Sequence, residues 1–351
     1  MSSSITQARP GHDLGEALEA FFRRRSDDPG TFRLVRYERI IGGYSRMMVR
    51  VWVQESGRER AYVVRADPPP GESIVDSDRA DEWALLCALM DNGSIPMPRP
   101  LCFEPACEEL GSPVIVTEMI DGPSLLGEAV QRAPREHYAM AERLCELAVR
   151  IHSFDVAALP AHVARPTSWD DYIDARIQQW VDAERAFPGA DPFMRMIARW
   201  LAANKPSPVP LGMVHGDFQP GNVVIDRDGS YRMIDWEMAH IGDPREDLGW
   251  MVLCGTNQPP PLIAANPRGF FDRYAELMGL PGEALDPAAV AYFTVFGSTD
   301  VFLRIVEQLG TLIRGETSSA LLAYMADSVA GMESVFMTAI TDHARATGVP
   351  A

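Results

Sequence analysis

The sequence is poor in cysteine, in basic residues and in long apolar stretches. Its five cysteines are odd in number and lack C-x-x-C spacing, which predicts buried thiols in a reducing compartment rather than a disulfide framework. A net charge of −17 disfavours nucleic acid as a partner, because phosphate backbones attract basic surfaces. Neither a run of about twenty apolar residues nor a charged and apolar leader is present, so we expect a cytoplasmic protein that binds no membrane.

The chain does have enough apolar residues to build a sizeable core. Of its 351 residues, 46% are hydrophobic and 23% are charged, which suffices for two lobes without a structural metal or disulfide. Residues 1–10 are expected to be disordered. The sequence shows no internal repeat, and it leaves the oligomeric state open.

The most informative segment, Val214 to Trp250, reads VHGDFQPGNVVIDRDGSYRMIDWEMAHIGDPREDLGW. Transfer of a γ-phosphoryl group needs a carboxylate beside the acceptor hydroxyl and oxygen ligands for Mg²⁺. Asn222 follows Asp217 at the spacing of the kinase catalytic loop, and Asp235 follows a short apolar strand, where a kinase has its metal-binding Asp. We therefore expect Asp217 to orient the hydroxyl, and Asn222 and Asp235 to bind Mg²⁺ through hard oxygen atoms.

Four other polar residues of this segment are predicted to support the site. His215 is expected to fix the loop by hydrogen bonding rather than to shuttle a proton, since a carboxylate is already available. Asp243 precedes Pro244, and Asp247 lies in the first turn of a predicted helix, so both favour helix capping and the dipole over metal binding. Glu237 completes the run I-D-W-E.

The N-terminal half contains candidates for binding nucleotide phosphates. Residues 39–53 read as a strand, a glycine turn and a second strand. Apolar residues recur at period two in the second strand: Met47, Val49, Val51 and Val53. The Gly42-Gly43 turn and the Ser45 hydroxyl would cover phosphates, and an ordinary hairpin is the alternative.

Arg65 lies near the end of the next predicted strand, where kinases carry a phosphate-binding lysine. Glu82 lies near the start of a predicted helix, residues 81–90. We expect Glu82 to form an ion pair with Arg65. A carboxylate placed for the helix dipole and a solvated arginine are the alternatives. The sequence does not determine how an arginine would contact the nucleotide phosphates in place of a lysine.

Three motifs, H-G-D-x4-N, I-D-W-E and G-D-P-x2-D-L, together resemble the aminoglycoside phosphotransferase and choline kinase superfamily, and especially its acyl-CoA-dehydrogenase-associated branch. The resemblance covers nearly the whole chain and is highly specific over the segment from Val214 to Trp250. It implies an α+β, bilobal, protein-kinase-like fold. An N-terminal lobe with an antiparallel sheet and one helix (residues 1–117) would be followed by a hinge (118–122) and a larger, mainly helical C-terminal lobe (123–351).

The resemblance also implies that the hinge backbone from Glu118 to Ile120 binds adenine. Beyond the hinge, apolar residues at helical spacing predict helices at 135–152, 168–187, 191–203, 269–278, 287–309 and 318–339. These helices would build the acceptor side of the cleft. Asp300 and Arg304 are candidates for lining it, and an i,i+4 surface pair is the alternative.

These features predict an ATP-dependent phosphotransferase that moves the γ-phosphoryl group to a hydroxyl of a small molecule, with Mg²⁺ as cofactor and GTP as the alternative nucleotide. A catalytically silent kinase-like module that binds nucleotide or a protein partner, and a phosphate-releasing hydrolase, are the other readings. The intact triad of Asp217, Asn222 and Asp235 argues against the silent module. The acceptor stays open among aminoglycoside, macrolide, choline-like amine, sugar and hydroxyacyl compounds, with the branch favouring a hydroxy acid or its thioester.

Overall fold

The computed structural model describes residues 13–40, 47–67, 78–187, 191–257, 260, 262–316 and 320–348. The chain divides into two compact units. Unit 1 comprises Met1–Met90 and Pro98–Ile120, and unit 2 comprises Asp91–Met97 and Asp121–Ala351. The division at Ile120 falls within the segment predicted as a hinge, whereas residues 91–97 belong to unit 2. The expected disorder of residues 1–10 lies outside the described residues.

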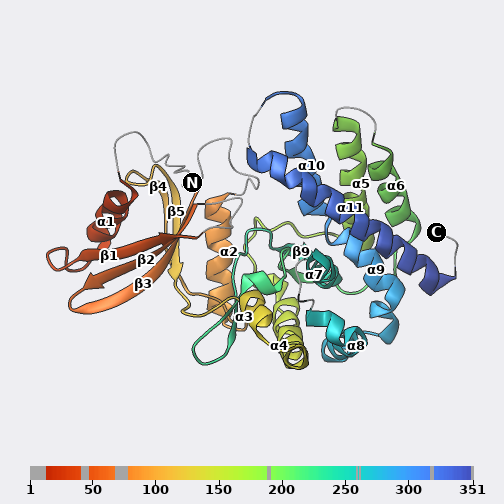
Figure 1. The fold of residues 1–351 in the computed structure, drawn as a ribbon, viewed down its shortest axis with the longest axis horizontal. Coiled ribbons are helices and arrows are strands. Elements are labelled where there is room, and N and C mark those ends of the chain that lie inside the picture. Colours follow the sequence, from red (N-terminus) through yellow and green to blue (C-terminus); the bar gives the residue numbers. More distant parts are fainter. Residues whose placement is uncertain are drawn as a thin grey trace. The chain divides into compact units, whose positions relative to one another are not determined.

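Unit 1 is built on a five-stranded antiparallel sheet with the strand order β1-β2-β3-β5-β4 (Figure 1). The strands are β1 (Arg33–Arg39), β2 (Met47–Glu55), β3 (Arg58–Ala66), β4 (Pro100–Cys107) and β5 (Ser112–Glu118). The period-two pattern predicted for β2 is confirmed, because its alternate valines are buried in the core of the unit. The helix predicted at residues 81–90 is α2 (Arg79–Asn92).

A second helix of unit 1, α1 (Leu14–Arg25), is absent from the sequence-based prediction. Asp13 caps it by accepting a hydrogen bond from the backbone N–H of Gly15 at 3.0 Å. Its apolar face forms one cluster with the buried valines of the sheet, and the helix packs along β1. The signal was present in the sequence: apolar residues at Leu14, Leu18 and Phe21 recur at helical spacing directly after a capping residue.

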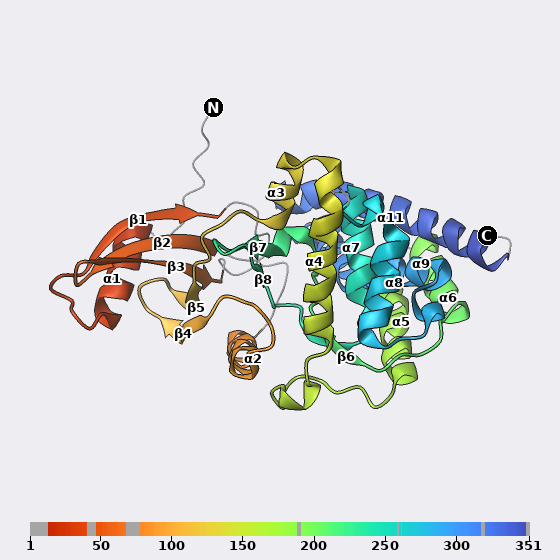
Figure 2. The ribbon, with the colours of Figure 1, turned by 90° about the horizontal axis from the view of Figure 1, so that it is seen from below.

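Unit 2 is mainly helical (Figure 2). Its helices are α3 (Leu125–Gln131), α4 (Pro134–His152), α5 (Trp169–Ala186), α6 (Pro192–Ala203), α7 (Arg245–Asn257), α8 (Pro267–Met278), α9 (Pro287–Phe296), α10 (Thr299–Ile313) and α11 (Ala320–Thr347). Short 3₁₀ turns add η1 (Val156–Ala158), η2 (Pro220–Asn222), η3 (Leu262–Ala265) and η4 (Gly282–Leu285). Helix α9 packs against both α7 and α11, α4 packs against α8, and α5 packs against α6.

The predicted helix at residues 287–309 is two helices, α9 and α10, interrupted at Gly297. This glycine lies against the start of α7, where a Cβ atom would come within 2.3 Å of the carbonyl oxygen of Glu246. Close packing between helices therefore requires glycine here, and α9 ends at the residue before it. By length and composition the whole stretch Pro287–Ile313 would be apolar enough to cross a membrane, but 67% of its most apolar window is buried inside the protein, as in a core helix.

Two short antiparallel pairs of strands complete unit 2. Strand β6 (Gly212–Val214) pairs with β9 (His240–Gly242), and β7 (Val223–Ile225) pairs with β8 (Tyr231–Met233). Between them, these four strands hold the loops that carry the residues singled out in the sequence.

Candidate active site

The loop from His215 to Asn222 leaves β6 and returns through η2 into β7. Within it the side-chain amide of Asn222 donates to the carboxylate of Asp217 at 2.5 Å and to its backbone carbonyl at 3.0 Å. The backbone N–H of Ile234, at the end of β8, donates to the carbonyl oxygen of Asn222 at 2.9 Å. The pairing of β7 with β8 therefore brings Asp235, the next residue, to the loop that carries Asp217.

Asp235 adopts a left-handed backbone conformation with φ of 67°. This conformation is uncommon for residues other than glycine, and such positions cluster at functional sites. Asn222 uses its amide nitrogen on Asp217, so the amide oxygen is the atom it would offer to a cation. One carboxylate and one amide oxygen are hard donors, and this set fits Mg²⁺.

Asp217 is partly buried and held by three side-chain donors. The indole N–H of Trp250 and the amide of Gln219 both donate to its Oδ1 atom at 2.7 Å, and Asn222 donates to Oδ2. Burial, with the negative charge of Asp235 beside it, raises the pKa of Asp217 to about 7, while these three hydrogen bonds act in the opposite direction. A divalent cation at Asp235 would offset the repulsion between the two carboxylates.

Trp250 and Gln219 are site residues that the sequence analysis missed. Trp250 lies on α7, which follows β9. Its indole reaches Asp217 because α7 packs against the loop from His215 to Asn222. No spacing rule connects Trp250 with Asp217, so the sequence alone carried no signal for this contact. Gln219 stands two residues after Asp217, in a position that a loop residue of any function could occupy.

Replacing Trp250 by phenylalanine should lower kcat by about 10- to 100-fold, because it removes a hydrogen bond to a charged carboxylate while keeping the aromatic bulk. The loss of a donor that lowers the pKa of Asp217 should also shift the acid limb of the kcat profile to higher pH. Steady-state kinetics over pH measure both effects.

Trp180→Phe is the matched control, since the indole N–H of Trp180 donates at 3.0 Å to Thr299 rather than to Asp217. This variant should keep the wild-type kcat and pH profile. An unchanged kcat and pH profile in Trp250→Phe would contradict the positioning role.

His215 holds the loop from His215 to Asn222 by hydrogen bonds, as predicted. Its Nδ1 atom accepts from the backbone N–H of Asp217 at 3.2 Å, which leaves Nε2 to donate to the carbonyl oxygen of Ile234 at 3.0 Å. Burial lowers the pKa of His215 to about 4, which favours the neutral ring.

Asp247 also holds this loop. Its two carboxylate oxygens accept from the backbone N–H groups of His215 at 2.7 Å and Gly216 at 2.9 Å, and His152 donates to it at 2.9 Å. Gly216 has φ of +83°, and a Cβ atom there would come within 2.4 Å of the carbonyl oxygen of Met238. Asp247 lies in the first turn of α7, as predicted, and its carboxylate oxygens also hold the backbone of the loop that carries Asp217.

Asp243 caps the start of α7, as predicted, because its carboxylate accepts a hydrogen bond from the backbone N–H of Arg245 at 3.0 Å. It is fully buried and forms an ion pair with the Arg245 guanidinium at 2.7 Å, which compensates its charge. The indole of Trp169 adds a further hydrogen bond at 2.7 Å. Glu237 lies in the turn between β8 and β9.

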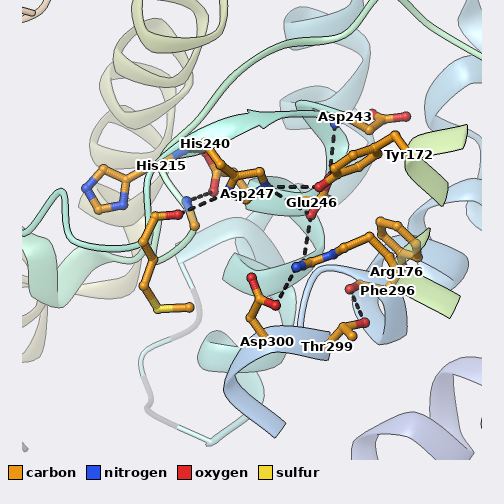
Figure 3. A network of polar contacts seen from close by, with 12 residues as sticks. Tyr172, Arg176, His215, His240, Asp243, Glu246, Asp247, Phe296, Thr299 and Asp300 are labelled. Atoms are coloured by element: carbon orange, nitrogen blue, oxygen red, sulfur yellow. Dashed lines mark hydrogen bonds and ion pairs between the residues drawn. The ribbon is translucent and has the colours of Figure 1, made fainter. Parts of the chain in front are cut away.

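A buried polar network lies beside these residues (Figure 3). Glu246 accepts from the hydroxyl of Tyr172 at 2.6 Å and from Arg176 at 3.4 Å, and Arg176 forms an ion pair with Asp300. The hydroxyl of Tyr172 also lies 2.9 Å from Nε2 of His240. This ion pair of Asp300 joins α10 to α5, which is distant in sequence, and it differs from the i,i+4 pair with Arg304 considered for Asp300.

In unit 1 the predicted ion pair between Arg65 and Glu82 is present at 2.8 Å. Glu82 is shared, because Arg79 donates to its other oxygen at 2.5 Å, and Arg79 in turn lies 2.5 Å from Asp67. The single lysine of the chain, Lys205, is part of unit 2 and pairs with Asp174. Unit 1 therefore contains no lysine that could bind the nucleotide phosphates in place of Arg65.

The predicted hinge and the predicted glycine turn are the other candidates for binding the nucleotide. Glu118 ends β5, and its backbone N–H donates to the carbonyl oxygen of Arg99 at 2.9 Å. Ile120 is the last residue of unit 1. Gly42, Gly43 and Ser45 lie outside the described residues, so their role as a phosphate loop stays a prediction.

Known proteins share this fold and sequence pattern. The model of the phosphotransferase enzyme family matches residues 36–280. Acyl-CoA dehydrogenase family member 10 of Mus musculus is 27% identical over 241 residues, which is 64% of this chain and 21% of that protein. The chain thus spans about a fifth of this curated relative.

Two solved structures illustrate the likeness in fold. A putative aminoglycoside phosphotransferase from Ralstonia eutropha superposes with a TM-score of 0.68 at 18% identity, covering 92% of this chain and 97% of that one. A thermostable mutant of the aminoglycoside phosphotransferase APH(4)-Ia, in a ternary complex with ADP and hygromycin B, gives a TM-score of 0.65 at 16% identity, covering 93% of this chain and 99% of that one. The predicted α+β kinase-like fold is confirmed, and the chain belongs to the phosphotransferase enzyme family.

Proposed function

We propose that the protein transfers the γ-phosphoryl group of ATP to a hydroxyl group of a small molecule. The observation that carries the proposal is the convergence of Asp217, Asn222 and Asp235 on one loop region, with the Asp217 carboxylate oriented by three donors. The relative APH(4)-Ia, crystallised with ADP and hygromycin B, supports the use of an adenine nucleotide and a small-molecule acceptor.

The chemistry follows from these side chains. The acceptor oxygen forms a bond to the γ-phosphorus while the bond from that phosphorus to the β,γ-bridging oxygen breaks, and ADP leaves. Asp217 accepts a hydrogen bond from the acceptor hydroxyl, orients it and takes up its proton late in the transfer. When bound, Mg²⁺ neutralises charge on the phosphate oxygens, and Asn222 and Asp235 would hold it.

In unit 1, Arg65 would bind the nucleotide phosphates. Its ion pair with Glu82 fixes the direction of the guanidinium, and Arg79 holds Glu82 from the other side. An arginine presents a planar fork of donors, which suits two phosphate oxygens at once. The backbone from Glu118 to Ile120 would bind the adenine ring, by analogy with the family.

A screen for ADP release tests the proposal. Purified protein is incubated with ATP and Mg²⁺ and with single aminoglycosides, macrolides, choline-like amines, sugars and hydroxy acids, and products are identified by mass spectrometry. We expect ADP together with one phosphorylated acceptor. ADP with free phosphate alone would indicate a hydrolase, and no ADP with any compound would favour a silent nucleotide-binding module.

A further inference from the structure

An apolar pocket of about 430 Å³ lies within unit 2, beside the catalytic loop. Its walls come from the loop itself and from helices far apart in the sequence: α3, α7, α8 and α9, with η3. Representative lining residues are Leu126, Pro220, Met251, Leu262, Phe271 and Val290. A cavity of this size accommodates a small ligand or one end of it.

The pocket shares two walls with the candidate active site. Pro220 belongs to the loop segment between Asp217 and Asn222. On α7, Cys254 lies one helical turn after Trp250, the residue whose indole donates to Asp217, so both project from the same side of the helix. A ligand in the pocket would therefore end next to the reacting carboxylate.

The chemistry of the lining selects against charge. Among the lining residues that the structure describes, none carries a charged side chain. The hydroxyl of Thr256 donates to the backbone carbonyl of Val252 at 3.0 Å, and Cys254 stays a neutral thiol. An ammonium group placed there would lose its hydration without a carboxylate partner, whereas an aliphatic chain would gain free energy for each methylene removed from water.

We propose that this pocket binds the aliphatic chain of the acceptor, so that the acceptor is a hydroxylated straight-chain molecule rather than a polycation or a sugar. The inference rests on the proposed phosphotransferase function. It adds the location of the acceptor site and the property that selects the acceptor, which is the length of its apolar chain.

The test is a homologous series of straight-chain primary alcohols of increasing length. For the wild-type protein kcat/KM should rise by up to about fourfold per methylene until the pocket is filled, since each buried methylene contributes to transition-state binding. Val290→Phe, which places a larger side chain on the half-buried α9 wall, should end this rise at a shorter chain. It should lower kcat/KM for the longest substrates by about tenfold or more and leave the shortest nearly unchanged.

Val130→Phe is the matched control, because Val130 lies on the same helix as Leu126 but is 61% exposed and does not line the pocket. It should keep the wild-type length profile. A length profile that is flat in the wild type, or one that Val290→Phe leaves unchanged, would overturn the inference.

Saturation-transfer NMR with the same alcohols separates this inference from the proposed function, because it detects binding without turnover. Length-dependent binding that Val290→Phe shortens would support the pocket assignment even if no phosphorylated product forms. Phosphorylation confined to aminoglycosides, amines or sugars would support the phosphotransferase and refute the apolar acceptor.

Discussion

Replacement of Asp217 by asparagine should lower kcat by about 10²- to 10⁴-fold, which is the usual contribution of a positioned acid or base. Asparagine has the same shape but cannot take up the proton of the acceptor hydroxyl, and its amide nitrogen would face the donating amide of Asn222. The affinity for ATP with Mg²⁺ should change little, because Asp217 is expected to contact the acceptor rather than the metal. Single-turnover kinetics and nucleotide titration measure the two quantities separately.

Asp228→Asn provides the control for this experiment. Asp228 is an exposed acid in the turn between β7 and β8, where it accepts a hydrogen bond from the backbone N–H of Ser230 at 2.8 Å. Loss of the same charge there should leave kcat unaltered. Near-normal turnover in Asp217→Asn, with an unchanged thermal unfolding midpoint, would refute the assignment of Asp217.

Asp235→Ala should weaken the binding of ATP in the presence of Mg²⁺ by about 10- to 100-fold, the range expected when a metal site is impaired. With EDTA in place of Mg²⁺, wild type and variant should bind ATP with similar affinity, since only the metal-dependent part of binding is lost. Isothermal titration with and without Mg²⁺ measures this difference.

A second variant distinguishes loss of the metal ligand from backbone strain. Alanine tolerates the left-handed conformation of Asp235 poorly, whereas asparagine adopts it readily. If Asp235→Asn shows the same loss of Mg²⁺-dependent affinity as Asp235→Ala, the carboxylate is the cause. An affinity that responds to Mg²⁺ as in the wild type, in both variants, would count against Asp235 as a metal ligand.

The candidate site was largely predictable because its parts are close in sequence. Strands β6 to β9 follow one another directly, so the order of Asp217, Asn222 and Asp235 along the chain also determines their arrangement in space. Helix caps such as Ser168 at α5 were predictable for the same reason, since the cap and the N–H group it binds are three residues apart.

Contacts between distant segments were not predictable in this way. The ion pair of Arg176 with Asp300 and the hydrogen bond of Trp250 with Asp217 depend on how helices of unit 2 pack against one another and against the loop. The need for glycine at Gly297, between α9 and α10, likewise comes from its close approach to α7. A single sequence shows that each of these residues is present, but it does not show which distant residue contacts it in the folded protein.

The most direct test of the central claim follows the γ-phosphoryl group itself. ATP labelled with ¹⁸O on its γ-phosphate is incubated with the protein, Mg²⁺ and the acceptor found by the screen, and the products are analysed by mass spectrometry. The proposed function predicts a phosphate ester of the acceptor that carries the label in equal amount to the ADP formed, and, with Asp217→Asn, the same product formed about 10²- to 10⁴-fold more slowly. Label recovered only as inorganic phosphate, or labelled ester formed equally by Asp217→Asn, would contradict it.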